Sequence, residues 1–334
     1  MGTVSHEQSL RLAARGLGNW AAHRPLVVSF EVTYSCTCDC RHCNHGGRLA
    51  EEELLEPGQY TALVSTLRPC VVQISGGEPL LRPDVLDIVR AAKRGGTGLP
   101  HVILVTNASL LDAGKYAEAK EAGVDRFSIS LDLPDARHDA SRGHPGLYAH
   151  LEETVPGLAR RFGNRDIALN CAITRWNLPH LVEVAERARQ WGVAVSYSAY
   201  GVLRTGNREF FISSEEDLAT LKQQIEALIR LKRRGWRILN SPYTLRSTYR
   251  FFRDEGVPRC PAGIGFLVVR PDGSLVPCSM KPNPRGYATQ GQLVEQFTRS
   301  NRCGACFVAI RAYSDKPLGR LMTDSLALAL AEGR

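Results

Sequence analysis

Eight of the ten cysteines in this sequence form two groups whose spacing is typical of metal ligands. The first group lies within the segment from Cys36 to Cys43, and the second consists of Cys260, Cys278, Cys303 and Cys306. Ten cysteines in 334 residues are too few for a disulfide scaffold, so the clustering indicates metal ligation in a reducing compartment. The two isolated thiols share strand parity with apolar neighbours, and we expect both to be buried in the core: Cys70 and Cys171.

The first group places three thiols on one short loop, separated by three and by two residues: Cys36, Cys40 and Cys43. Three thiolates can hold three irons of a [4Fe–4S] cluster and leave the fourth iron open. A zinc ion is the alternative, because another residue of this segment could supply the fourth ligand: Cys38, His42 or His45. The spacing alone leaves both metals open.

Short β-branched runs alternate with amphipathic stretches from Leu26 to Ala199, which predicts strands and helices in turn. The expected strands are Leu26–Thr33, Cys70–Ser75, His101–Thr106, Asp125–Leu131, Asp166–Thr174 and Val193–Ala199. The expected helices are Pro57–Arg68, Pro83–Arg94, Leu110–Ala122, Leu147–Phe162, Leu178–Trp191 and Ser214–Arg234. This repeat implies a parallel sheet with helices outside. Six strands are too few for the eight-stranded barrel, so we expect an α/β fold with an open, partial (β/α)6 TIM-like barrel.

Alternate residues along the expected strands are polar, although parallel strands covered on both faces should be apolar throughout. The apolar parity, which includes Val28 and Phe30, must face the helices. The polar parity must then face a lumen that holds a site, or else an open sheet face in water. Glu31 and Asp132 lie on this polar parity and are the candidates for orienting a substrate.

The pattern changes near Tyr243, where helical periodicity gives way to a stretch rich in glycine and proline. Two apolar runs, Phe266–Val269 and Ser274–Val276, flank Pro271-Asp272-Gly273 and predict a hairpin. We therefore expect a small cysteine-rich appendage after the barrel. The expected division is an N-terminal helical segment over 1–24, the partial barrel over 25–235 and the appendage over 236–334.

Further motifs follow the cysteine trio in order along the chain, and most of them lie at the ends of expected strands. They are Ser75-Gly76-Gly77-Glu78-Pro79, Thr106-Asn107, Ser130-Leu131-Asp132, His138-Asp139 with Arg142-Gly143, and Asn170 with Asn177. Together with the trio, this ordered set resembles the radical S-adenosylmethionine (radical SAM) superfamily from about Leu26 to Cys306. Because these motifs occur together, an iron–sulfur cluster is favoured over zinc at the trio.

The resemblance implies a [4Fe–4S] cluster on the trio whose open iron chelates the methionine end of SAM. One electron then breaks the S–C5′ bond, and the 5′-deoxyadenosyl radical takes a hydrogen from the substrate. The resemblance also implies the contacts with SAM. The backbone of the Gly76-Gly77-Glu78-Pro79 turn would approach SAM closely, and Glu78 would accept a hydrogen bond from its ammonium group. Ser130 and Asn170 would contact the ribose, Arg142 would pair with the carboxylate, and His42 would stack on the adenine. His42 stands where the superfamily often has an aromatic residue.

The second cysteine group resembles the auxiliary-cluster region of SPASM and twitch radical SAM enzymes. The twitch form fits better, since Cys306 is the last cysteine and the further ligands of a full SPASM region are missing. Four thiolates suffice for one more [4Fe–4S] cluster. A structural zinc site is the alternative, because four cysteines ending in Cys-x2-Cys are also a zinc pattern.

These observations predict a radical SAM oxidoreductase with two [4Fe–4S] clusters that abstracts hydrogen from a peptide or a small natural-product or cofactor precursor. Dehydrogenation or epimerisation of a sugar or aminocyclitol is a second hypothesis. A non-catalytic iron–sulfur electron carrier or a zinc-structured binding protein is a third. An electron donor such as flavodoxin or ferredoxin is implied. Because 35 residues before Cys36 are too few for a peptide-recognition domain, a peptide would bind in the lumen or need a separate carrier.

Charge and hydropathy exclude other classes of protein. Lys and Arg number 42 against 34 Asp and Glu, but the basic residues are spread along the chain, and we expect no nucleic-acid partner. The run Arg230–Arg237 closes an expected helix, where cations suit the helix dipole; a nucleic-acid patch is the alternative. Ser9–Trp20 predicts a packed amphipathic helix, with membrane or partner contact as the alternative. No apolar stretch approaches the roughly 18 residues of a membrane span. His6 and Glu7 interrupt any signal peptide, so we expect a cytoplasmic protein.

Overall fold

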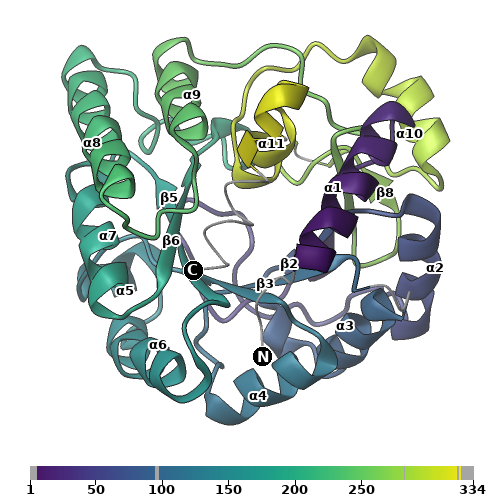
Figure 1. Cartoon of the computed structure of the whole chain (residues 1–334), viewed down its shortest axis with the longest axis horizontal. Helices are drawn as coiled ribbons and strands as arrows, with labels where there is room; N and C mark the ends of the chain where they lie inside the picture. Colours follow the sequence, from purple (N-terminus) through teal and green to yellow (C-terminus); the bar gives the residue numbers. More distant parts are fainter. Residues whose placement is uncertain (1–5, 95–97, 282, 322, 325–334) are drawn as a thin grey trace.

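Eight strands form one sheet in the order β6-β5-β4-β3-β2-β1-β7-β8 (Figure 1). The computed structural model describes residues 6–94, 98–281, 283–321, 323 and 324. Strands β1 to β7 pair in parallel, and β8 pairs antiparallel with β7. The bounds are β1 Val27–Thr33, β2 Val71–Gly76, β3 His101–Thr106, β4 Arg126–Ser130, β5 Ile167–Ile173, β6 Ala194–Ala199, β7 Phe266–Val269 and β8 Leu275–Val276. All six strands expected for the partial barrel are confirmed, and the described edge strands β6 and β8 do not pair, so the barrel is open.

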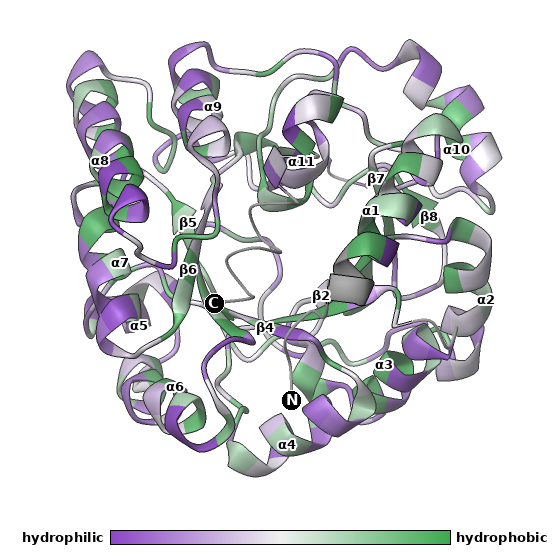
Figure 2. Cartoon of the chain, viewed as in Figure 1, coloured by the Kyte–Doolittle hydropathy of each residue, from purple (hydrophilic) through white to green (hydrophobic). Residues whose placement is uncertain are grey.

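The helices that connect successive strands of the barrel cover the outside of the sheet (Figure 1). The α-helices are α1 His6–Ala21, α2 Pro57–Leu67, α3 Val85–Lys93, α4 Ala113–Ala122, α5 Arg137–Arg142, α6 Leu147–Phe162, α7 Leu181–Gln190, α8 Glu215–Arg233, α9 Pro242–Arg253, α10 Gln290–Gln296 and α11 Ala309–Ser314. Short 3-10 helices are η1 Pro79–Leu81, η2 Leu178–His180, η3 Val202–Arg204 and η4 Thr298–Ser300. The outer helices carry both hydrophobic and hydrophilic residues (Figure 2), as expected for elements with one face on the sheet and one in water.

The apolar parity of the strands packs against these helices, as predicted. Phe30 of β1 is fully buried, with its ring centroid 4.9 Å from that of Tyr60 on α2. Phe127 of β4 stacks on Tyr116 of α4 with 4.3 Å between centroids. The alternate residues therefore point to the inner face, where Ser29 of β1 lies in the polar parity. Burial of the apolar parity fixes the register of each strand and so fixes which residues reach the inside.

The predicted hairpin is present as β7 and β8, and it extends the barrel sheet. Val27 of β1 pairs with Phe266 of β7, so the cysteine-rich region begins its fold on the edge of the first strand. At the opposite edge, the backbone N–H of Ala309 in α11 donates to Oγ of Ser198 on β6 at 2.9 Å. Because α11 contacts β1 and β7 as well as β6, it bridges the two sides of the open barrel.

The prediction that helical structure ends near Tyr243 is wrong, because α9 occupies Pro242–Arg253. Oγ of Ser241 accepts a hydrogen bond from the backbone N–H of Thr244 at 3.3 Å and caps the helix. Leu245 and Phe252 lie at helical spacing and are fully buried, so tertiary packing stabilises a segment of modest helix propensity.

Two further predictions concern the ends of helices. The run Arg230–Arg237 does close a helix, since α8 ends at Arg233 and Gly235 adopts a φ of 87° just beyond it. The expected N-terminal helix is present as α1, and Nδ2 of its Asn19 donates to the carbonyl of Arg68 at 2.8 Å, which ties its end to the barrel. No described helix is long and apolar enough to cross a lipid bilayer.

Candidate active site

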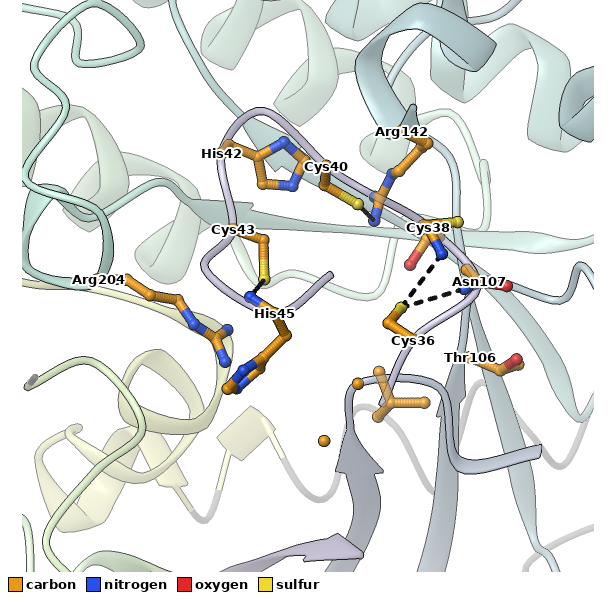
Figure 3. A pocket seen from close by; sticks show the side chains of 14 residues that line it. Cys36, Cys38, Cys40, His42, Cys43, His45, Thr106, Asn107, Arg142 and Arg204 are labelled. Carbon is orange, nitrogen blue, oxygen red and sulfur yellow. Dashed lines mark hydrogen bonds between the residues drawn. The ribbon is translucent and has the colours of Figure 1, made fainter. Parts of the chain in front are cut away.

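The Cys36–Cys43 loop leaves the end of β1 and surrounds a cavity at the carboxyl ends of the strands, where α/β folds place their sites. Figure 3 shows the thiols of the predicted trio turned toward one central space. The cavity has a volume of about 170 Å³. Its lining residues are Cys36, Cys38, Cys40, His42, Cys43, His45, Gly76, Gly77, Val105, Thr106, Asn107, Ser130, Arg142 and Arg204.

Hydrogen-bond donors surround the three thiols of the trio. Sγ of Cys36 lies 3.7 Å from Nδ2 of Asn107, and Sγ of Cys40 lies 3.8 Å from Nη1 of Arg142. Sγ of Cys43 accepts from the backbone N–H of His45 at 3.4 Å. Such donors stabilise thiolates, and the thiolate is the form that binds a metal.

Cys38 lies beside two members of the trio. Hydrogen bonding with its thiol lowers the pKa of both Cys36 and Cys40 to about 7, against the opposing effect of burial. The same two contacts raise the pKa of Cys38 itself far above the usual range. These shifts favour the proton on Cys38 over Cys36 and Cys40.

Gly76 and Gly77 permit the contact between the end of β2 and the beginning of the cysteine loop. A Cβ on Gly77 would lie 2.1 Å from the carbonyl oxygen of Ser35, and one on Gly76 would lie 2.1 Å from that of Thr33. Gly76 also has a φ of 131°, which a side chain would strain. Both glycines line the cavity, so a ligand there meets backbone.

Glu78 lies behind the cavity wall with its side chain fully buried. Its carboxylate accepts from Oγ1 of Thr106 at 2.7 Å, from the backbone N–H of Asn107 at 2.8 Å and from that of Leu80 at 3.0 Å. Burial raises the pKa of Glu78 to about 6, although the hydrogen bonds oppose this. The structure thus shows Glu78 joining β3 to η1; its expected contact with an ammonium group stays a prediction.

Arg142 lines the cavity from the end of α5 and forms a buried ion pair. Its Nη2 lies 2.8 Å from Oδ2 of Asp132, while Oδ1 of Asp132 accepts from the backbone N–H of Ala172 at 2.9 Å. Burial raises the pKa of Asp132, but the charge of Arg142, acting together with His42, His138 and the hydrogen bond from Ala172, holds the pKa below its usual value. Nε of Arg142 is buried without a hydrogen-bond partner among the described residues, so this guanidinium retains a donor for an anion.

Of the other predicted residues, some line the cavity and some do not. Ser130 and His42 line the cavity, and burial lowers the pKa of His42 to about 4, which keeps its ring neutral and suited to stacking. Asn170 lies deeper on β5, where its Oδ1 accepts from Oγ of Ser196 at 3.1 Å. Glu31 is buried on β1 near Tyr34. Their roles toward SAM or substrate stay predictions.

Sequence reasoning missed Glu52, which fixes the start of the cysteine loop. Its carboxylate accepts from Oγ1 of Thr33 at 2.5 Å, from the backbone N–H of Tyr34 at 2.5 Å and from Oγ of Ser35 at 3.2 Å. Glu52 lies in a charged loop with no motif of its own, so only the folded chain reveals these contacts.

The second cysteine group converges in a separate buried cluster that also contains Val27 of β1, Phe266 of β7 and Met280. Burial raises the pKa of Cys260 to about 11 and of Cys306 to about 12, and it raises the pKa of Cys278. The charge of Cys303 also raises the pKa of each of these thiols, so all four lie close together. Backbone N–H groups of Met280 and Lys281 donate to Cys278.

A zinc ion and an iron–sulfur cluster make different demands on the thiols. Within the residues that the structure describes, no three His, Cys, Asp or Glu side chains come together closely enough to hold a single metal ion. Zinc draws its ligands onto one centre at about 2.3 Å from each sulfur. A [4Fe–4S] cluster instead distributes them over separate irons. A cluster at the trio would use three thiolates and one at the second group would use four, and both assignments stay predictions.

Comparisons with known proteins agree with this geometry. Residues 30–188 match the model of the radical SAM superfamily. An AdoMet-dependent heme synthase of Methanosarcina barkeri is 28% identical over 77% of this chain and 78% of its own length. A PqqA peptide cyclase of Gluconobacter oxydans is 27% identical over 76% of this chain and 70% of its own.

The fold itself has solved counterparts. SuiB of Streptococcus suis, in a crystal structure with the precursor peptide SuiA, superposes with a TM-score of 0.61 at 14% identity. The match covers 85% of this chain and 68% of SuiB, and at this identity it shows a shared fold. The cysteine trio around its cavity, the matched model and the shared barrel agree: residues 30–188 of this chain form a domain of the radical SAM superfamily.

Proposed function

We propose that this enzyme binds a [4Fe–4S] cluster on Cys36, Cys40 and Cys43, cleaves SAM reductively and abstracts hydrogen from a peptide or a cofactor precursor. The observation that carries the proposal is the convergence of these thiols on one cavity with two glycines and an arginine. When bound, the cluster supplies the electron that breaks the S–C5′ bond.

The residues of the chain would bind and orient SAM. Gly76 and Gly77 expose backbone on one side of the cavity, and Arg142 offers its unpaired Nε on another. A planar guanidinium suits a carboxylate, so Arg142 would meet the carboxylate of SAM while Asp132 holds it in place. The neutral ring of His42 would stack on the adenine.

The class of substrate is inferred from the relatives. One is a heme synthase, another a peptide cyclase, and SuiB crystallises with a precursor peptide. A peptide or a peptide-derived or tetrapyrrole cofactor precursor is therefore the substrate class that we propose. The buried inner face of the sheet, with Glu31, would contact it. The electron donor would be a flavodoxin or ferredoxin, and a peptide would bind in the lumen or arrive on a separate carrier.

We propose that Cys260, Cys278, Cys303 and Cys306 bind a second [4Fe–4S] cluster. Four converging thiols would complete its ligand set, so it would move electrons without binding substrate. Support comes from the buried position of the group and from the backbone donors to Cys278.

SAM cleavage is tested by anaerobic reconstitution followed by dithionite and SAM, with 5′-deoxyadenosine measured by chromatography. Wild type and Cys70→Ala, a change at an isolated buried thiol, should form the product. Cys36→Ala should form none. Protein with verified iron and sulfide at both sites that yields no 5′-deoxyadenosine would favour an electron carrier over this enzyme.

A further inference from the structure

A fully buried arginine lies next to the second cysteine group. Arg311 is on α11, five residues after Cys306, and its side chain has no solvent exposure. A buried guanidinium is costly unless every donor is satisfied and its charge is compensated. Its position therefore requires an explanation.

The guanidinium joins the two chain segments that carry ligands of the second group. Nη1 donates to the carbonyl of Cys306 at 2.8 Å. Nη2 donates to the carbonyls of Val257 at 2.6 Å and Pro258 at 3.2 Å, just before Cys260. One side chain thus fixes the approach to Cys260 and the exit from Cys306.

The charge of Arg311 acts on the thiols as well. Burial raises the pKa of Cys260 and of Cys306, and the guanidinium opposes that rise in both. Its counter-charge is Asp315, whose Oδ2 accepts from Nε at 3.0 Å. Because Asp315 is 26% exposed whereas Arg311 is buried, water screens the carboxylate more than the cation.

We propose that Arg311 is the positioning residue of the auxiliary site: it clamps both ligand loops and places a fixed positive charge beside the cluster that they hold. This inference rests on the proposed auxiliary cluster. The charge favours the reduced, more negative form of the cluster, and so it raises the midpoint potential.

The test uses the full chain with Cys36→Ala, Cys40→Ala and Cys43→Ala, so that only the auxiliary cluster remains. Iron content and an EPR-monitored redox titration are measured. Arg311→Met should lose most of the bound iron and shift the remaining midpoint potential to more negative values. Arg311→Lys keeps the positive charge but lacks the planar guanidinium that reaches both loops. Compared with Arg311→Met, it should restore the midpoint potential more fully than the iron content.

Two other variants separate charge from packing. Asp315→Asn keeps an acceptor for Nε and removes the counter-charge, so the potential should shift to more positive values, opposite to Arg311→Met. Arg302→Met is the matched control, because this arginine adjoins Cys303 but is exposed, and it should change neither quantity.

Different failures have different meanings. A background variant that holds no iron contradicts the auxiliary cluster and with it this inference. Iron that is bound with an unchanged potential in both Arg311→Met and Asp315→Asn overturns the role of Arg311 alone. Shifts of the same sign in these two variants would also overturn it, since a purely structural role would disturb both alike.

Discussion

At the scale of single residues, Gly77 sets how closely β2 approaches the cysteine loop. The position that a Cβ would take is 2.1 Å from the carbonyl oxygen of Ser35 and 2.7 Å from that of Tyr34. Both obstacles are backbone atoms, which cannot rotate away as a side chain would. The absence of a side chain at this position is therefore a requirement of the site.

Gly77→Ala should destabilise the protein by about 1–3 kcal/mol, the usual cost of overpacking, and should weaken SAM binding. Urea unfolding and calorimetric titration with SAM measure the two effects. Gly58→Ala is the control, because a Cβ there meets nothing within 4 Å and alanine favours the helix. Equal stability and SAM affinity in both variants would contradict the steric account.

Glu78 gives a prediction that depends on pH. Its pKa rises from 4.5 to about 6 in the folded protein, so folding favours the protonated carboxyl. The stability that this group contributes is full below pH 4.5 and is lost as pH rises through 6. At about 1.4 kcal/mol per pKa unit, the loss is about 2 kcal/mol.

Glu78→Gln should remove this loss, although the variant is less stable throughout because an amide cannot accept all three hydrogen bonds. Unfolding of the cluster-free chain between pH 4.5 and 7 measures the slope. Glu118→Gln, at an exposed position on α4, should follow the wild type. Parallel curves for wild type and Glu78→Gln would show that Glu78 titrates normally.

At the scale of elements, the cysteine loop depends on contacts that the sequence could not reveal. The strands were predictable because β-branched runs with alternating polarity leave few other solutions, and the Ser75–Pro79 turn was predictable from its glycines. Glu52 and Arg311 were not, since their partners lie many residues away and neither belongs to a motif. The α9 helix was missed because its aromatic and β-branched residues are poor helix formers in isolation.

Glu52→Ala should release the beginning of the cysteine loop. Hydrogen bonds to a charged group contribute about 1.5–3 kcal/mol each at most, and their loss should lower the free energy of unfolding by about 2 kcal/mol. Iron retained at the trio after desalting should fall as well. Glu53→Ala, at the exposed neighbouring position, should behave as wild type. A Glu52→Ala variant with normal stability and iron would show that the loop holds itself in place.

At the scale of the whole molecule, one sheet carries both cysteine groups. The trio follows β1, and the second group surrounds β7, which pairs with β1. Sequence reasoning found both groups and the hairpin that lies between Cys260 and Cys278. It did not place the hairpin on the barrel edge, because two short apolar runs do not specify the strand beside which they pair.

The two sites should nevertheless load independently, since they share no ligand. Wild type should bind about eight irons, and the variant with all three trio cysteines changed to alanine about four. Changing Cys260, Cys278, Cys303 and Cys306 to alanine should likewise leave about four. Colorimetric iron and sulfide assays measure these values. Loss of all iron from either variant would contradict independence.

The central claim is that the trio leaves one iron open for SAM. The most direct measurement is the EPR spectrum of the reduced cluster in the variant that lacks the four auxiliary thiols, recorded before and after SAM is added. We predict that SAM changes the g-values and that Arg142→Ala requires more SAM for the same change. A spectrum of the reduced cluster that is identical with and without saturating SAM would contradict the claim.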